Sequence, residues 1–180
     1  FSHYGCFISR PKPWNLCLMT QAAMLTAPIL LPKDDWVFSP ADAAVAIIVV
    51  DHKTVLMQHR DTHEGLIFPG HWSLFGGAVD EGEEPIDALI RELYEEILLT
   101  VNKAEYFTAI DYDFEFCKKG ISQRRYYIVH ITDTEQKKLE LHEGDGMKTF
   151  TLPEILTTDK VVPFDAWALW MYANRKALSE

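Results

Sequence analysis

The chain has 180 residues and a formal net charge of −10, from 27 acidic and 17 basic side chains. This length suits one domain with room for an extension. Hydrophobic residues at 48% and aromatic residues at 12% exclude an intrinsically disordered chain. The acidity argues against a protein that holds duplex nucleic acid through a broad basic face, because that binding mode depends on Lys and Arg contacts to phosphates.

The first forty residues contain five prolines that would interrupt any regular element. We expect residues 1–40 to form a Pro-rich N-terminal extension, part of it a leader, and residues 41–180 to form the folded domain. The apolar stretch 14–31 is too interrupted by polar residues for a transmembrane helix, although a secretory signal is an alternative. Three cysteines without a CxxC pair favour a reducing compartment, so we expect a cytoplasmic protein with no membrane partner.

From residue 41 onward, strand patterns and helical patterns follow one another. The β-branched run Ala43–Val50 predicts a strand covered on both faces. Glu83–Leu98 predicts the main helix, because its apolar residues recur at helical spacing and Pro85 suits the first turn. Further strands are expected at Thr54–His59, Trp72–Val79 (broken by Gly76-Gly77), Tyr106–Phe116, Gln123–Thr132 and Met147–Thr151, with a helical turn at Pro153–Leu156 and a closing helix at Phe164–Leu178. This order predicts an α/β sandwich with a mixed sheet.

Three glutamates gather on one side of the predicted main helix. At about 100° per residue, Glu92, Glu95 and Glu96 lie within an arc of roughly 100° beside and opposite the apolar stripe. Carboxylates this close repel one another in a partly dehydrated site, and a hard cation such as Mg²⁺ or Mn²⁺ relieves the repulsion. The alternative is a solvated acidic helix face. Arg91 favours the metal site, because its guanidinium can hold carboxylates by paired hydrogen bonds.

The segment from Gly77 to Leu99 resembles the Nudix box, Gx5Ex7REUxEExGU, in which U is aliphatic. It matches every fixed position except Leu98, where the pattern has glycine and where we expect a slightly different exit from the helix. The motifs W-x-x-F-G-G at 72–77 and L-x-x-x-R at 56–60 resemble further family features. The resemblance covers roughly residues 41–175. It implies a Nudix-like α/β/α sandwich with a mixed β-sheet.

The resemblance also implies a role for each matching residue. The implied metal ligands are the main-chain carbonyl of Gly76 and the side chains of Glu92, Glu95 and Glu96. Glu83 would assist a metal-bound water, and Arg91 would orient the glutamates. The implied enzyme hydrolyses the phosphoanhydride bond of a nucleoside diphosphate linked to another moiety X, in a nucleoside triphosphate, a nucleotide sugar or an ADP-ribose-like molecule. A non-catalytic Nudix-fold module that binds a nucleotide is the alternative.

Outside the box, Glu143 is our candidate for an additional base or ligand, and the alternative is an exposed loop acid. Arg60 and Arg124 are candidates for binding substrate phosphates. Strand alternation would send Arg125 to the face opposite Arg124, so at most one of this pair is expected in the site.

Aromatic residues give weaker signals. Trp72 and Phe68 are candidates for stacking on a nucleobase, and for Trp72 core packing is the alternative. Trp167 and Trp170 on the closing helix indicate either core packing or a contact in a homodimer. Residues 76–100 contain eight acids and one base, so most of the net charge lies in this one segment. We therefore interpret the acidity as a cation site rather than as a general surface property.

Overall fold

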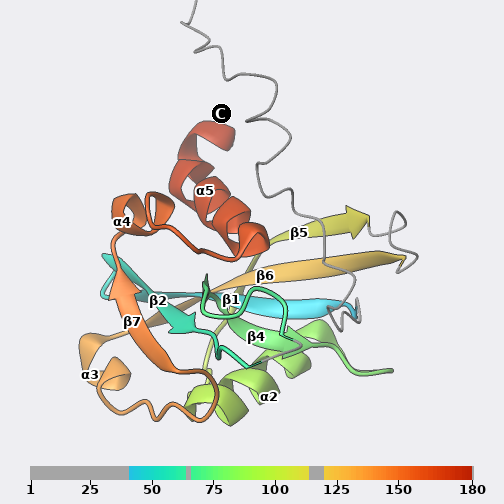
Figure 1. The fold of residues 1–180 in the computed structure, drawn as a ribbon, viewed down its shortest axis with the longest axis horizontal. Helices are drawn as coiled ribbons and strands as arrows, with labels where there is room; N and C mark the ends of the chain where they lie inside the picture. The colour runs from blue at the N-terminus through green and yellow to red at the C-terminus, as the bar shows by residue number, and fades with distance from the viewer. Residues whose placement is uncertain (1–40, 64–65, 114–119, 180) are drawn as a thin grey trace, which may run out of the picture. The chain divides into compact units, whose positions relative to one another are not determined.

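The computed structural model describes residues 41–63, 66–113 and 120–179 (Figure 1). The predicted extension, residues 1–40, lies outside the described residues, as do the last residues of the predicted strand Tyr106–Phe116. Within the described part of the chain, no helix is both long and apolar enough to cross a membrane.

A mixed sheet of seven strands forms the centre of the described domain. Its strand order is β3-β2-β1-β6-β5, with β4 also paired to β1 and β7 also paired to β2. The strands are β1 (Ala43–Val50), β2 (Thr54–His59), β3 (Trp72–Ser73), β4 (Phe75–Ala78), β5 (Glu105–Asp113), β6 (Ile121–Ile131) and β7 (Gly146–Phe150). β1 and β6 run parallel, and the other pairs are antiparallel. All eight residues of β1 are buried, which confirms a strand covered on both faces.

Helices cover both faces of this sheet, so the predicted α/β/α sandwich is confirmed (Figure 1). α2 (Pro85–Ile97) packs on one face through Ala88, Leu89, Leu93 and Ile97. α4 (Leu152–Leu156) and α5 (Pro163–Leu178) cover the other face through Ile155, Ala168, Leu169 and Tyr172. The short helix α3 (Asp133–Gln136) was not predicted, because none of its residues is buried and it has no apolar periodicity; a capping box at Thr132 begins it.

The extended segment 72–79 is broken at Leu74, and the prediction of a break at Gly76-Gly77 is wrong. β3 pairs with β2, whereas β4 crosses to pair with β1. Between them, the Leu74 backbone N–H donates to Oδ2 of Asp165 at 3.0 Å instead of joining a strand ladder. This crossing leaves Gly76 and Gly77 inside β4, beside the first residues of β1.

Leu98 ends α2 in the left-handed conformation, with φ 53° and ψ 29°. Its backbone N–H donates to the Tyr94 carbonyl at 3.0 Å, and the Leu99 N–H donates to the Leu93 carbonyl at 3.1 Å. The backbone therefore adopts the cap conformation that glycine usually supplies, and our expectation of a different exit is wrong. A leucine in this conformation carries steric strain from its Cβ, of about 1–2 kcal/mol.

This strain predicts that Leu98→Gly will be more stable than Leu98→Ala by about 1 kcal/mol. Both substitutions remove the leucine side chain, but only glycine removes the Cβ that clashes in the left-handed conformation. The free energy of unfolding in urea measures the difference. Equal stability of the two variants would mean that position 98 is not strained.

Candidate functional site

The site begins where α2 lies against β4. The Gly76 backbone N–H donates to Oε2 of Glu96 at 2.9 Å. A Cβ built on Gly77 would lie 2.4 Å from the carboxyl carbon of Glu92, which is far inside contact distance. The missing side chain at Gly77 thus allows the Glu92 carboxylate to approach the strand. Two carboxylates of the predicted metal site are therefore set directly against the backbone of β4.

Glu96 is the most deeply buried of these carboxylates, with 5% of its surface exposed. Its pKa is raised to about 8, mainly by burial and in part by repulsion from the nearby carboxylates of Glu143 and Glu92. The Gly76 N–H and the more distant Arg60 act in the opposite direction. The pKa of Glu92 is also raised, again mainly by burial, although Arg91 opposes the shift. The structure thus concentrates acidic groups where their charged forms are poorly solvated.

Arg91 is the centre of an ion-pair network beside these carboxylates. Its Nε and Nη2 donate to the two oxygens of Glu83 at 3.0 and 2.9 Å, and its Nη1 donates to Oε1 of Glu92 at 2.7 Å. Nη2 also donates to the Ala78 carbonyl at 3.1 Å, which ties the network to β4. These contacts lower the pKa of Glu83 and raise that of Arg91. Arg91 therefore orients Glu83 and Glu92, and it favours the charged form of Glu83.

Glu95 lies apart from its two neighbours. Its side chain is 59% exposed, and its nearest ionic contact is Arg91 Nη1 at 3.4 Å. It does not belong to the described residues that line the adjacent cavity. Of the three predicted ligands on α2, the structure thus brings Glu92 and Glu96 to the cavity and leaves Glu95 at its rim.

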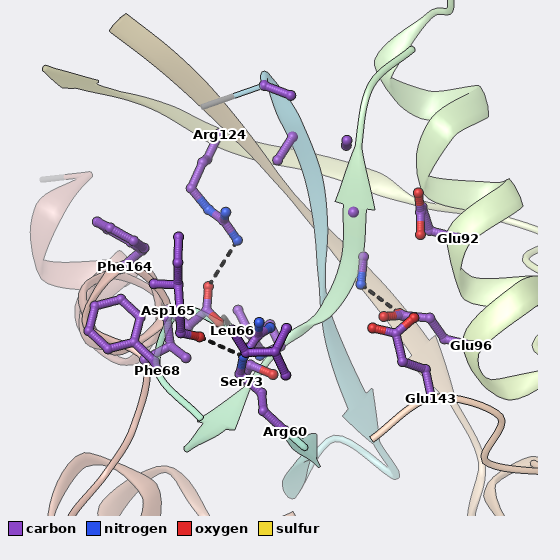
Figure 2. Close-up of a pocket in the computed structure, with 18 residues that line it drawn as sticks. Arg60, Leu66, Phe68, Ser73, Glu92, Glu96, Arg124, Glu143, Phe164 and Asp165 are labelled. Carbon is purple, nitrogen blue, oxygen red and sulfur yellow. Dashed lines mark hydrogen bonds and ion pairs between the residues drawn. The ribbon is translucent and has the colours of Figure 1, made fainter. Parts of the chain in front are cut away.

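A cavity of about 380 Å³ opens beside Glu92 and Glu96 and has two chemically different ends (Figure 2). Glu143 points toward Glu96 at the first end, and Gly76 and Gly77 complete the wall there. The second end is formed by aromatic and charged side chains from three separate segments: Phe68, Arg124, Phe164 and Asp165. The volume lies within the range of small-molecule sites.

Arg60 and Arg124 both line the cavity, as do Leu66 and Ile67. Arg60 Nε donates to the Ile67 carbonyl at 3.1 Å, so it holds the loop that covers this side. Arg125 lies elsewhere and pairs with Asp42 at 3.6 Å. The structure thus brings two of the three arginines considered from the sequence to the cavity.

Asp165 was missed from the sequence. It is 1% exposed, accepts the Leu74 N–H through Oδ2, and pairs through Oδ1 with Arg124 Nη2 at 3.6 Å. Within the described residues, Asp165 Oδ1 and Arg124 Nε are buried without a hydrogen-bond partner. An acid in the first turn of a helix ordinarily suits the helix dipole, so no sequence signal distinguished Asp165 from a capping residue.

The structure places the aromatic candidates in different surroundings. Phe68 and Phe164 meet edge to face at the second end of the cavity, with ring centroids 5.8 Å apart. Trp72 does not line the cavity. It packs edge-on against Phe150 and His59 and lies partly buried against the hydrophobic core. Trp167 and Trp170 stack on each other at 5.1 Å on the exposed surface of α5, with 49% and 42% of their surfaces exposed. Core packing is therefore wrong for this pair.

The donor chemistry at the first end suits a hard cation. Carboxylates of Glu92, Glu96 and Glu143 and the backbone of Gly76 supply only oxygen ligands, which Mg²⁺ and Mn²⁺ prefer. In the described residues, no three side chains are already arranged to hold one ion. Glu92 accepts from Arg91 and Glu96 accepts from the Gly76 N–H, each through one carboxylate oxygen. The residues fit such an ion, but the site is not preformed.

Comparison with known proteins agrees with this geometry. A family model of the NUDIX domain matches residues 40–170. The RNA pyrophosphohydrolase of Helicobacter pylori (strain P12) is 32% identical over 111 residues, which are 56% of this chain and 70% of that protein. The RNA pyrophosphohydrolase of Bartonella quintana (strain Toulouse) is 41% identical over 61 residues, or 32% of this chain and 35% of that protein.

Solved structures resemble the described domain at lower sequence identity. The MutT NUDIX hydrolase from Burkholderia pseudomallei has a TM-score of 0.60 and 20% identity, covering 74% of this chain and 98% of that chain. The NUDIX domain of Shewanella oneidensis NrtR, solved with ADP ribose, has a TM-score of 0.58 and 19% identity, covering 88% and 99%. These likenesses show the fold alone. Because the family model matches most of the chain and includes the box on α2, the chain belongs to the Nudix family and is a Nudix-type pyrophosphohydrolase.

Proposed function

We propose that this enzyme uses a divalent metal to hydrolyse the phosphoanhydride of a nucleoside diphosphate linked to a moiety X. A nucleoside triphosphate, a nucleotide sugar and an ADP-ribose-like molecule are the candidate substrates. The two-ended cavity carries this proposal: carboxylates crowd one end, and two phenylalanines with an Arg–Asp pair form the other. A nucleotide has the same division, with charged phosphates at one end and a flat aromatic base at the other.

In this proposal Glu92, Glu96 and the Gly76 carbonyl would hold Mg²⁺ or Mn²⁺, and Glu95, which lies outside the cavity lining, would be a further ligand. The ion, when bound, neutralises the diphosphate and lowers the pKa of a water molecule. Crowded carboxylates with raised pKa support this assignment, because a cation removes the repulsion that burial makes costly.

The remaining residues of the site orient the substrate and accept a proton. Arg91 fixes the orientation of Glu83 and Glu92 and favours the ionised form of Glu83. Glu143, whose side chain points toward Glu96 at the carboxylate end of the cavity, takes the proton of the attacking water as general base. Arg60 supplies positive charge for the phosphates, and Arg124, which pairs with Asp165, binds the substrate at the nucleoside end. Catalysis of this type depends mainly on positioning and on neutralising charge.

The second end of the cavity suits the nucleoside. Phe68 and Phe164 offer apolar ring surface, and the buried Oδ1 of Asp165 lacks a hydrogen-bond donor within the described residues. A base that presents an N–H group would satisfy this oxygen after a small adjustment. Trp72, in contrast, packs against the core and does not line the cavity, so we leave it out of the proposed base site.

A second substrate candidate comes from the relatives named RNA pyrophosphohydrolases, which share 32% identity with this chain over 111 residues. This substrate would be an RNA whose end carries the same phosphoanhydride bond. The net charge of −10 and the small cavity favour the free nucleotide, because extended contacts to RNA would need more basic surface.

We expect the purified protein with Mg²⁺ to release two phosphorylated products from a nucleotide in a panel of nucleoside triphosphates, ADP-ribose, a nucleotide sugar and a short RNA with a 5′-triphosphate. Glu92→Gln and Glu96→Gln should each lower kcat at least about a hundredfold, because each removes a charged ligand. Product chromatography gives the rates.

Glu140→Gln is the matched control, since the Glu140 side chain is exposed and does not line the cavity, and its rate should equal that of the unaltered protein. Binding of a nucleotide by calorimetry without any product would favour the non-catalytic alternative. Glutamine variants as active as the unaltered protein would contradict the assigned ligands.

The raised pKa of Glu96 predicts a pH-dependent stability in the absence of metal. The unfolded chain ionises Glu96 near pH 4.5, but the folded protein does so only near pH 8. Folding stability from this group is therefore present below pH 4.5 and is lost as the pH rises to 8, by at most about 1.4 kcal/mol per pH unit. Glu96→Gln should flatten this slope in EDTA, and Mg²⁺ should stabilise the unaltered protein more at pH 8 than at pH 6.

Urea unfolding at pH 5, 6, 7 and 8, with EDTA or with Mg²⁺, measures both effects. The Glu140→Gln variant should keep the slope of the unaltered protein. If Glu96→Gln kept it as well, burial of Glu96 would not be its source.

The proposed base position predicts that Phe68→Leu raises KM for the nucleotide about tenfold and leaves kcat nearly unchanged. Leucine keeps apolar volume but removes the ring face, and stacking of a base on an aromatic ring contributes about 1–3 kcal/mol. Phe68→Tyr keeps the ring and serves as the control. A lower kcat with unchanged KM in Phe68→Leu would place the base elsewhere.

A further inference from the structure

We propose that Gln58 on β2 is a positioning residue that holds Glu143 at the carboxylate end of the cavity. The inference deepens the proposed function and rests on it, because Gln58 acts only through the role of Glu143 in the reaction. Gln58 itself does not line the main cavity and does not touch the reacting atoms.

Gln58 is a polar side chain in an otherwise apolar place. It is 3% exposed and follows three buried apolar residues, Val55–Met57. An amide in such a place is costly unless it is hydrogen-bonded. Its Nε2 donates to the Glu143 carbonyl at 3.0 Å, and its Oε1 accepts from the Ser73 hydroxyl at 3.2 Å. Both ends of the amide are thus used, and the donor end is directed to the backbone of Glu143.

The loop around Glu143 is tied to the site on both sides. The His142 N–H donates to the Glu96 carbonyl at 2.8 Å, and the Asp145 N–H donates to the His59 carbonyl at 2.8 Å. Glu143 lies between these two anchors, and of the three ties only the bond from Gln58 uses a side chain. A substitution at position 58 can therefore release Glu143 while the two flanking backbone anchors remain.

The loop also passes in close contact with Gln58. Gly144 has φ +89°, and a Cβ built on it would lie 2.9 Å from Cγ of Gln58 and 2.7 Å from the His59 carbonyl oxygen. The loop backbone is thus pressed against β2 at the residue after Glu143. This close approach fixes the origin of the Glu143 side chain.

The fixed backbone matters because the Glu143 carboxylate is repelled by its neighbours. Glu143 lies beside Glu96 at the carboxylate end, and its charge contributes to the raised pKa values of Glu92 and Glu96. Without the Gln58 contact, this repulsion would move Glu143 between its two flanking backbone anchors. Gln58 opposes that movement, and a shift of about 1 Å in a catalytic group can lower a rate by up to a hundredfold.

Gln58→Met tests the inference, because methionine keeps the length and burial of the side chain and removes both hydrogen bonds. With Mg²⁺ and either ADP-ribose or the four nucleoside triphosphates, whichever the unaltered protein hydrolyses, kcat should fall about tenfold and KM should stay unchanged. Gln123→Met is the matched control. That glutamine donates to Asp111 in an exposed pair on β6, so its loss should leave both constants unchanged.

A double-mutant cycle with Glu143→Gln separates positioning from a general structural effect. If Gln58 acts through Glu143, Gln58→Met should lower kcat in the unaltered protein but have no further effect in the Glu143→Gln background. Additive losses, or a Gln58→Met enzyme with normal kcat, would overturn the inference. Inactivity of the unaltered protein on every nucleotide would instead overturn the proposed function.

Gln58→Leu provides a second replacement in case methionine prevents folding, and the urea unfolding midpoint checks both. A folded variant at position 58 with the predicted loss of kcat and the non-additive cycle supports positioning. If neither variant folds, Gln58 is required for the core as a whole and the positioning role is rejected.

Discussion

The burial of one carboxylate against the backbone of a strand is the constraint on which the site depends. Glu96 is almost wholly buried, and its carboxylate accepts a hydrogen bond from the Gly76 N–H on β4. That contact requires α2 to lie directly on β4, and it requires a glycine at position 77 so that Glu92 fits beside it. This packing of α2 on β4 directs the carboxylates of Glu92 and Glu96 into the cavity, and their burial there raises the pKa of both.

The sheet joins this carboxylate end to a second end that comes from the other side of the domain. β1 contacts α2 through one face and α5 through the other, and β4 crosses from β3 to β1 where the two layers meet. Asp165 at the start of α5 takes the Leu74 N–H that the crossing leaves outside a strand ladder. One irregularity in the sheet thus brings an acid from the last helix into the same cavity as the acids of α2.

Local patterns were enough to predict most of the fold and the first end of the site. The β-branched run of β1 and the helical spacing in α2 each have a strong physical period, and the spacing of Gly77, Arg91 and the glutamates indicated the end of the cavity where we propose a metal. Asp165 and Gln58 had no such signal. Their importance comes from partners 91 and 85 residues away in the sequence, Leu74 and Glu143, which no local pattern specifies. Trp72 does not line the cavity, and its contacts with Phe150 and His59 agree with the core-packing alternative, because an aromatic side chain in a strand suits a core as well as a base.

The distribution of charge distinguishes the proposed metal end of the cavity from the proposed base end. Residues 76–100 hold eight of the acids with a single arginine, and that arginine is fully engaged with Glu83, Glu92 and Ala78. In the structure, Glu92 accepts from Arg91 and Glu96 accepts from the Gly76 N–H, and the pKa of each is raised mainly by burial. A cation at the proposed metal end would offset the repulsion between these buried carboxylates. At the proposed base end, Phe68 and Phe164 already meet edge to face. The proposed base end is therefore already assembled, whereas the proposed metal end needs a cation to balance its charge.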